Sequence, residues 1–390
     1  MGFDSLAQLI TSKKVKRIKI YFMYMAVQEL TAIVKPTHNC NLKCRYCYLP
    51  ENAKHSRMDQ TTLQNTTDQL VGLDGLEDLN IIWHGGEPLL MGVDFFRQAI
   101  GMQPQDGNVQ ISNNIQSNVT LVNDEILDFC QEADIDIGMS LDGPKEIHNM
   151  SRVYPSGKGS FDDAFRGVMM VKERDLGRGV ISVVTKKTIG YARDIYDFAQ
   201  EHGLSLKFNP LITSGRELSH HDDLALGPEE YGNAMCDLFD YWMEFGEGAM
   251  PIDPFDTIIA NMTTDTVLGC NYKGGCRKAF ISIGPSGEVY PCGRFDGIDE
   301  AFLGNINEDN LQDMLESTKH SKMAERSSET VPGCKICDYK KICNAGCMHN
   351  AYMVNGDFLG KDYYCASYKK MFNHITNRVK AELKKAEWGT

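Results

Sequence analysis

The sequence predicts an α/β protein in which a partial (β/α)6 barrel of the TIM type is followed by a smaller, cysteine-rich unit. Three observations indicate this arrangement: six strand-like segments that alternate with helix-like ones, the end of that alternation near residue 212, and a concentration of cysteines in the last third. Alternating strands and helices favour a parallel sheet with right-handed crossovers. Six units are fewer than the eight of a closed barrel, so we expect an open one.

Each expected strand is a short, mostly apolar segment, and helix-like patterns separate the strands. The expected strands cover 29–36, 79–84, 109–115, 134–141, 180–185 and 204–211. The expected helices cover 59–72, 92–102, 123–132, 160–174 and 191–202. Because the chemistry of such barrels lies at the carboxyl ends of the strands, residues that follow a strand are the first candidates for a site.

The second half has a different pattern. Residues 214–228 are typical of a loop, and 231–245 predict an amphipathic helix. After Asp253 the chain has short segments, many glycines and clustered cysteines, which is typical of a small unit organised by metal. A segment rich in Lys, Glu and Ala at 367–387 predicts a closing helix. The expected division is an N-terminal extension at 1–28, a barrel at 29–250, a cysteine-rich domain at 251–370 and a C-terminal helix at 371–390.

Charge and composition narrow the classes of function. The chain has a formal net charge of −13, which disfavours a nucleic-acid partner because that binding depends on neutralising phosphates. No apolar stretch is long enough to span a bilayer, and no signal-peptide pattern is present, so we expect a cytoplasmic protein without a membrane partner. The basic run at 13–19 is typical of a solvated arm.

The cysteines favour metal ligation over disulfides, because there are 13 of them and a reducing cytoplasm keeps thiols reduced. The strongest local motif has the spacing C-x3-C-x2-C, at Cys40, Cys44 and Cys47, directly after the first expected strand. Three thiolates on one loop suit three irons of a cubane and leave the fourth iron open for chemistry. The alternative is a zinc site with His38 or His55 as the fourth ligand.

With this motif the chain resembles the radical S-adenosylmethionine (SAM) superfamily. In that family the three cysteines bind a [4Fe–4S] cluster, whose free iron takes the amino and carboxylate groups of SAM. Tyr46, just before the last cysteine, also fits the family pattern. The end of the second expected strand matches the family's GGEP turn, which contacts the methionine end of SAM, with the residues Gly85, Gly86, Glu87 and Pro88.

The third expected strand ends in a partial match to the same superfamily. Gln116, Ser117 and Asn118 stand where the family often has a Q-T-N-G stretch, with Ser117 in place of Thr and Val119 in place of Gly. The resemblance implies that Gln116, Ser117 and Asn118 bind SAM.

The fourth expected strand ends in Ser140-Leu141-Asp142-Gly143-Pro144, and Arg152 follows. The resemblance implies that Ser140, Asp142 and Arg152 bind SAM, with Ser140 and Arg152 near its carboxylate or ribose. The alternative is a strand-end cap and an ordinary surface arginine.

A second cysteine array occupies the last third of the chain. It consists of Cys270, Cys276, Cys292, Cys334, Cys337, Cys343, Cys347 and Cys365. Its order closely resembles the SPASM domain, which binds two auxiliary [4Fe–4S] clusters in peptide-modifying radical SAM enzymes. The resemblance gives Cys270, Cys276, Cys292 and Cys347 to the first auxiliary cluster and the other four to the second.

Four thiolates for each cubane leave no vacant iron, which favours electron transfer over binding of a substrate thiol. Two zinc knuckles are the alternative for this array. Cys130 and Cys236 lie on expected helices outside both arrays, and we expect them to be buried apolar residues.

The resemblance implies a radical SAM oxidoreductase that matures a peptide or protein. An external one-electron reductant of the flavodoxin or ferredoxin type allows SAM to be cleaved, and the resulting 5′-deoxyadenosyl radical takes a hydrogen atom from the substrate. We expect the substrate to be a ribosomally made peptide and the product a carbon–carbon or thioether cross-link, with the auxiliary clusters accepting an electron.

Three alternatives remain. One branch of the family oxidises a Cys or Ser of a sulfatase to formylglycine, and its base is an Asp directly after the third auxiliary cysteine. That position is Gly293 here, which counts against this branch, although Asp296 lies nearby. Epimerisation of a residue is a second alternative and would need a hydrogen donor. A non-enzymatic iron–sulfur electron carrier is the third, but a carrier has no use for SAM-binding strand ends.

Overall fold

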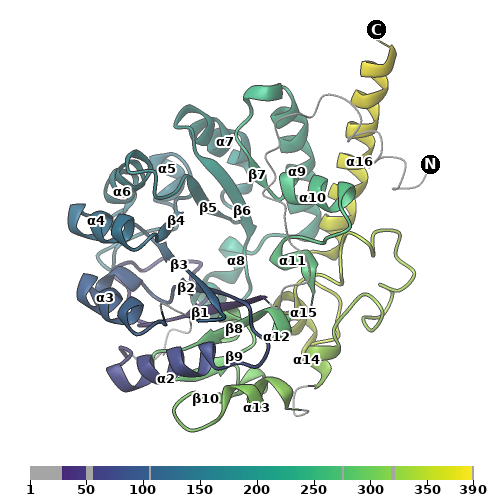
Figure 1. Ribbon diagram of the computed structural model, residues 1–390. Coiled ribbons are helices and arrows are strands. Elements are labelled where there is room, and N and C mark those ends of the chain that lie inside the picture. Colours follow the sequence, from purple (N-terminus) through teal and green to yellow (C-terminus); the bar gives the residue numbers. More distant parts are fainter. Residues whose placement is uncertain (1–28, 50–55, 105–106, 275, 318–320, 389–390) are drawn as a thin grey trace.

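The protein is described by a computed structural model that covers residues 29–49, 56–104, 107–274, 276–317 and 321–388. The expected N-terminal extension and the alternative zinc ligand His55 lie outside these residues. Within them, one sheet of ten strands has the order β10-β9-β8-β1-β2-β3-β4-β5-β6-β7. The α/β barrel that the sequence predicts is confirmed, and its strands curve around an open interior (Figure 1).

The six barrel strands run parallel to their neighbours, as the alternation predicts. Their bounds are β1 Glu29–Val34, β2 Asp78–Trp83, β3 Gln110–Ser117, β4 Asp136–Ser140, β5 Gly179–Val184 and β6 Ser205–Pro210. In β2, buried residues alternate with half-buried ones, because successive side chains point to opposite faces of the sheet. Val34 and Trp83 are paired in register, so β1 and β2 end at the same edge.

Helices cover the outer face of the barrel (Figure 1). They are α2 Gln60–Val71, α3 Val93–Gly101, α4 Asp124–Glu132, α5 Lys145–His148, α6 Phe161–Glu173 and α7 Ala192–Glu201. Side-chain caps set two of the starts, because Asp59 accepts a hydrogen bond from the Thr62 amide and Asn123 accepts one from the Ile126 amide. The helices therefore bury one face against the strands and leave the carboxyl ends of the strands open.

The second half extends the barrel sheet instead of forming a sheet of its own. β8 Phe280–Ile283 pairs in parallel with β1, and β9 Glu288–Tyr290 pairs antiparallel with β8. Two-residue strands close the edges, β10 Gly304–Asn305 beside β9 and β7 Ile252–Asp253 beside β6. The cysteine-rich half is thereby fixed next to the first strand of the barrel.

The remaining helices connect and brace this second half. They are α8 His221–Leu224, α9 Pro228–Met243, α10 Phe255–Thr263, α11 Cys270–Lys273, α12 Cys276–Ala279, α13 Leu311–Glu316, α14 Ser321–Glu325, α15 Met348–Asn355 and α16 Cys365–Trp388. α16 lies along α9, where Arg378 and His374 contact Asp240 at 2.7 and 3.0 Å. None of the described helices has the length and apolar character needed to cross a membrane.

The prediction of a loop at 214–228 is wrong. A 3-10 helix spans Gly215–His220, and α8 follows it directly. Contacts with other parts of the protein fix the conformation of this segment. Leu224 is buried, the Arg216 amide donates to the Cys47 carbonyl, and the Arg216 guanidinium donates to the Cys44 carbonyl. Because these partners are distant in the sequence, the local sequence does not reveal them.

Candidate functional site

A cavity of about 360 Å³ lies at the carboxyl ends of the barrel strands, where it is bounded on one side by the cysteine-rich half. Cys40, Cys44 and Cys47 line it from the loop after β1. Cys270, Cys276 and Cys292 line it from the other half. The first cysteine array and three cysteines of the second, which the sequence separates by more than 200 residues, therefore line the same cavity.

The loop that carries the first three cysteines is tied down along its length. The amides of Lys43 and Arg45 donate to the carbonyls of Val153 and Ser151 at 2.7 and 3.0 Å. Burial, together with neighbouring thiolates of the same loop, raises the pKa of Cys40 to about 12 and that of Cys44 to about 11. Three thiols held together against this repulsion are suited to a cationic group that binds them as thiolates.

The GGEP turn packs against this loop. The Gly86 and Glu87 amides donate to the carbonyls of Thr37 and Asn39 at 2.9 and 2.8 Å. A Cβ atom on Gly86 would lie 2.1 Å from the Asn39 carbonyl oxygen, so the close approach requires glycine. The turn thus positions the end of β2 against the cysteine loop.

Glu87 connects this turn to the end of β3. Its carboxylate accepts hydrogen bonds from the Ser117 hydroxyl and the Asn118 amide, both at 2.8 Å. Burial raises the pKa of Glu87 to about 7, although these hydrogen bonds act to lower it. Of the expected SAM-binding residues in these two strand ends, Gly85, Gly86, Gln116 and Asn118 line the cavity, whereas Glu87, Pro88 and Ser117 lie behind it.

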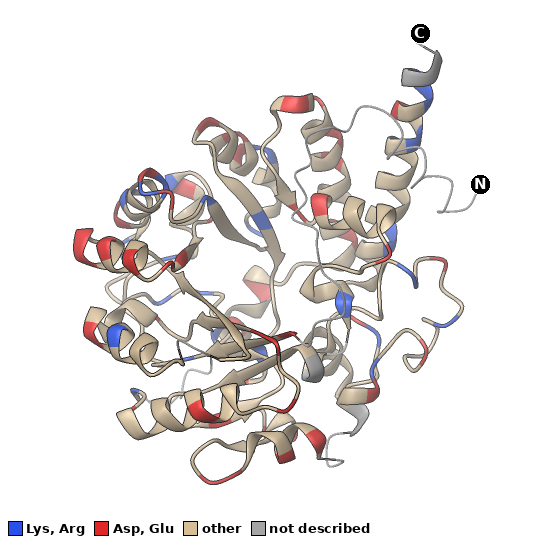
Figure 2. Ribbon diagram, viewed as in Figure 1, with Lys and Arg blue, Asp and Glu red and all other residues tan. Residues whose placement is uncertain are grey.

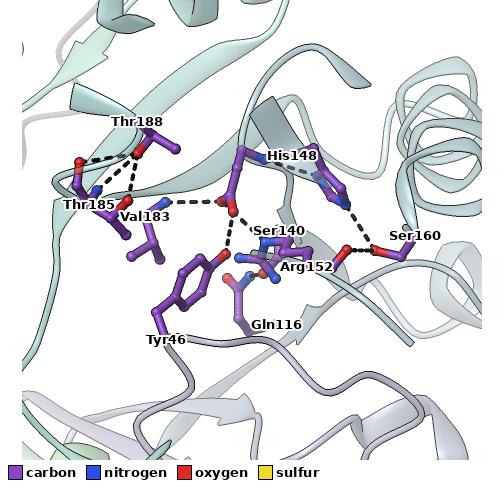
Figure 3. Close-up of polar contacts among 10 residues, drawn as sticks. Tyr46, Gln116, Ser140, His148, Arg152, Ser160, Val183, Thr185 and Thr188 are labelled. Atoms are coloured by element: carbon purple, nitrogen blue, oxygen red, sulfur yellow. Dashed lines mark hydrogen bonds and ion pairs between the residues drawn. The ribbon is translucent and has the colours of Figure 1, made fainter. Parts of the chain in front are cut away.

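A buried charge network joins the cysteine loop to the ends of β4 and β5 (Figure 3). The Tyr46 hydroxyl donates to the Asp142 carboxylate, which also pairs with Arg152 at 3.1 Å and accepts from the Val183 amide at 3.1 Å. The Arg152 guanidinium lies over the Tyr46 ring, 5.4 Å from its centroid. Arg152 lines the cavity with Ser140, whereas Asp142 lies behind them and binds Arg152.

His148 supports this network from α5. The Asp142 amide donates to its Nδ1 at 3.3 Å, and its Nε2 lies 3.0 Å from the Ser160 hydroxyl (Figure 3). Burial lowers the pKa of His148 to about 4, so the imidazole is neutral at pH 7. Arg152 is therefore a buried residue with fixed partners, and the alternative of an ordinary surface arginine does not hold.

Eight cysteines of the second array form two spatial groups. In the first, burial, together with the neighbours Cys270 and Cys347, raises the pKa of Cys292 to about 12. The Arg294 guanidinium lies 3.6 Å from the Cys347 sulfur. In the second group, burial and the neighbours Asp362, Cys365, Cys334 and Cys337 raise the pKa of Cys343 to about 12. Each group brings together thiols from separate parts of the sequence, since Cys347 lies near Cys270 and Cys292, and Cys365 lies near Cys334.

Sequence reasoning missed three residues at the junction of the two halves, because none of them belongs to a motif. Lys35 is fully buried at the end of β1, where its ammonium donates to the Gly293 carbonyl at 2.6 Å and to the Asp296 carboxylate. His84 lines the cavity beside Gly85, and Arg294 lines it beside Cys292. The pairing of β1 with β2 places His84 near Lys35, and the pairing of β1 with β8 brings the cysteine-rich half to the same place.

The described thiols suit a group larger than a single ion. Every cysteine is free, and no three His, Cys, Asp or Glu among the described residues are placed to hold a single metal ion. Ligands of a cubane stand farther apart than those of zinc, because they bind different irons. Cys130 and Cys236 lie in the hydrophobic core, as expected.

Comparisons with known proteins agree with these features. Residues 34–199 match the model of the radical SAM superfamily, and 275–338 match an iron–sulfur cluster-binding domain, SPASM. The chain is 30% identical over 376 residues to a serine-type anaerobic sulfatase-maturating enzyme of Bacteroides thetaiotaomicron, a match that covers 89% of this chain and 90% of the relative. It is 29% identical to a cysteine-type enzyme of the same description from Clostridium perfringens, over 90% of this chain and 97% of the relative.

A solved structure is also similar. The enzyme named anSMEcpe, with bound AdoMet and the peptide Cp18Cys, matches with a TM-score of 0.80 and 26% sequence identity. The match covers 92% of this chain and 99% of that one.

Proposed function

The chain belongs to the SPASM-containing maturases of the radical SAM superfamily, and from that membership we propose that it oxidises a Cys or Ser side chain of a peptide or protein to formylglycine. It is a radical SAM enzyme that modifies a peptide or protein and uses SAM and [4Fe–4S] clusters. The observation that carries the proposal is the single cavity lined by both cysteine arrays. A side chain bound there lies within reach of a radical source and of an electron acceptor.

Three sets of thiolates hold the clusters in this proposal. Cys40, Cys44 and Cys47 bind the cluster that takes SAM, Cys270, Cys276, Cys292 and Cys347 bind the first auxiliary cluster, and Cys334, Cys337, Cys343 and Cys365 bind the second. When bound, these groups supply a 5′-deoxyadenosyl radical and a place for one electron. Support comes from the mutual proximity of free thiols within each set.

The cavity wall between the two arrays binds and orients SAM. Gly85 and Gly86 line the cavity, and their lack of side chains lets the turn pack against Thr37 and Asn39, which places its backbone where the methionine end would bind. Gln116, Ser140 and Arg152 present a side-chain amide, a hydroxyl and a fixed positive charge, which suit the carboxylate and ribose. Asp142 and Glu87 act behind them as positioning residues.

Oxidation of the substrate must balance in hydrogen, electron and proton. The Cβ of the target residue would lose a hydrogen atom and then one electron, which bound SAM and an auxiliary cluster would take up. The thiol or hydroxyl loses a proton as the carbon–sulfur or carbon–oxygen double bond forms. A thioaldehyde then reacts with water to give the aldehyde and hydrogen sulfide. The enzyme therefore needs a proton acceptor at the cavity.

We assign that proton to His84. Burial and then the charge of Lys35 lower its pKa to about 4, so its imidazole is neutral at pH 7 and is a weak base. It therefore takes a proton from a strong acid, which the protonated thioaldehyde or aldehyde left after electron loss is. It lines the cavity, and the Gly85 backbone hydrogen-bonds its imidazole. Asp296 is less suited, because it pairs with Lys35 and does not line the cavity. Burial acts to raise the pKa of Asp296, but Lys35 and His38 hold this pKa below its usual range.

A radical cross-link in a ribosomally made peptide is the second candidate. Gly293 favours it, because this position carries no carboxylate beside Cys292 to take a proton from a target thiol. Epimerisation is less favoured, because each cysteine that lines the cavity belongs to a proposed cluster set and Cys130 and Cys236 lie in the core.

The test uses the reconstituted enzyme without oxygen, with SAM, a reductant and a sulfatase-motif peptide whose target Cys carries deuterium at Cβ. We expect the peptide to become an aldehyde and the 5′-deoxyadenosine to gain deuterium, both measured by mass spectrometry. The control peptide has Ala at the target position. SAM cleavage without change in the Cys peptide would exclude formylglycine formation and direct the search to a precursor peptide that becomes cross-linked.

A further inference from the structure

The segment between Cys334 and Cys343 differs in charge from the rest of the chain. It contains Lys335, Lys340 and Lys341 and a single acid, Asp338, whereas the whole chain carries a net charge of −13. Figure 2 shows positive segments on the loop between α14 and α15 and along α16, whereas acids predominate on α4. A basic surface thus lies over the second set of auxiliary cysteines in an acidic protein.

An apolar side chain stands in the middle of these lysines. Ile336 is 88% exposed, more than any other large hydrophobic residue among those described. It lies between Cys334 and Cys337 in the sequence, and its neighbour Lys335 has a side chain that is 73% exposed. A single exposed isoleucine is common on protein surfaces, and here it adds an apolar contact point among the lysines beside two cluster cysteines.

Two further lysines lie near Cys365, the last cysteine of this set. Lys361 and Lys369 line the same pocket as Cys334, Cys337 and Cys365. Glu329 offsets two cations, since it lies 3.8 Å from Lys335 and 3.3 Å from Lys340. Within the described residues, no ion pair engages the three lysines Lys341, Lys361 and Lys369.

We propose that this lysine surface, formed by Lys335, Ile336, Lys340, Lys341, Lys361 and Lys369, docks an acidic one-electron carrier protein of the flavodoxin or ferredoxin class. The inference rests on the proposed cluster at Cys334, Cys337, Cys343 and Cys365. Weak electron-transfer encounters use small interfaces, and complementary charge raises their association rate. A carrier seated over Ile336 would lie above these cysteines. In each encounter the cluster held there would be oxidised by one electron and the carrier reduced by one electron, with no bond made or broken.

The test measures association of the holoenzyme with purified flavodoxin under anaerobic conditions. The variant Lys340→Glu/Lys341→Glu/Lys369→Glu reverses three charges on the lysine surface. The matched control, Lys145→Glu/Lys158→Glu/Arg178→Glu, makes the same change in net charge on the barrel. Binding is followed by titration calorimetry, and electron exchange with reduced flavodoxin by stopped-flow absorbance at several salt concentrations.

We expect the surface variant to associate at least about tenfold more slowly than the wild type at low salt and to lose most of its salt dependence. The control variant should keep a clear salt dependence, and its association rate should fall much less. Equal behaviour of the two triple variants would overturn the proposal and leave the lysines as an ordinary solvated face. Ile336→Ser, which changes no charge, should weaken binding at high salt as well, and an unchanged affinity would also count against the docking site.

Iron content separates this inference from the proposed function. If Cys337→Ala leaves the iron content of the holoenzyme unchanged, the assignment of the second auxiliary cluster fails. If the cluster is present and the lysine variants bind flavodoxin normally, only the docking surface fails.

Discussion

Buried charges near the cavity depend on their partners, so single substitutions there have large effects. Arg152 and Asp142 are both almost completely buried, and the ion pair between them is supported by Tyr46 and the Val183 amide. Arg174 makes a comparable pair with Asp124 and Asp128 on the surface, where water screens it.

Removal of the buried arginine should therefore cost far more than removal of the surface one. We expect Arg152→Met to lower the free energy of unfolding by about 3–5 kcal/mol, because it leaves the Asp142 carboxylate buried without its cation. Arg174→Met should cost less than about 1 kcal/mol. Denaturant titration measures both, and the double variant Arg152→Met/Asp142→Asn should recover part of the loss. Equal costs for the two single variants would contradict this account.

His84 provides a test of the proton acceptor. We expect His84→Gln to lower the rate of peptide oxidation by about 10²–10⁴-fold, because glutamine fills similar space but accepts no proton. SAM should still be cleaved, so the ratio of 5′-deoxyadenosine to oxidised peptide should rise, which mass spectrometry measures for both products. His220→Gln, at an exposed position, is the control. A normal ratio in His84→Gln would assign the proton to another group, with Asp296 the next to test.

At the scale of elements, the turn between β4 and α6 depends on a neutral histidine. His148 accepts a hydrogen bond from the Asp142 amide, and its folded pKa of about 4 lies below the usual value of about 6.5. Between these two values the unfolded chain binds a proton that the folded one does not. The contribution of His148 to the free energy of unfolding is therefore fully present above pH 6.5. It falls by about 3 kcal/mol as the pH is lowered toward 4.

The acid sensitivity of this turn should disappear with the imidazole. We expect the melting temperature of His148→Gln to be lower than that of the wild type at pH 7. Between pH 7 and pH 5, however, it should fall less than that of the wild type. Thermal unfolding of both proteins at each pH, without oxygen, measures the difference. Parallel pH profiles would show that His148 does not keep its neutral form in the fold.

Element by element, the sequence predicted the barrel far better than the second half. The strand expected at 204–211 is β6 Ser205–Pro210, because a buried apolar strand between turns has a clear local pattern. β7 and β10 have two residues each and no such pattern, and each is placed only by its pairing with a longer neighbouring strand, β6 or β9. The same distinction applies to the site, where spaced cysteines and the GGEP turn were predictable but Lys35, His84 and Arg294 were not.

At the scale of the whole molecule, the two halves share a core. β8 extends the parallel sheet through its pairing with β1, with Ala32 opposite Ile281, and both residues are fully buried. Lys35 adds a buried polar link, because it joins β1 to the Gly293 carbonyl and the Asp296 carboxylate. Two domains joined by a linker would lack such contacts, so we expect the barrel and the cysteine-rich half to unfold together.

Native-state hydrogen exchange can test this cooperativity in the intact holoenzyme. The buried amides of β4 and of β8 should exchange with the same free energy and the same dependence on denaturant, because neither strand can open while the other remains folded. Lys35→Met should lower both values equally, whereas Lys187→Met, which removes a surface ion pair with Asp223, should change neither by more than a few tenths of a kcal/mol. Exchange of β8 at clearly lower denaturant than β4 would instead identify the cysteine-rich half as a separate folding unit. In that case the wall that the two cysteine arrays share would exist only while the halves are docked, and substrate entry would have to be sought in their separation.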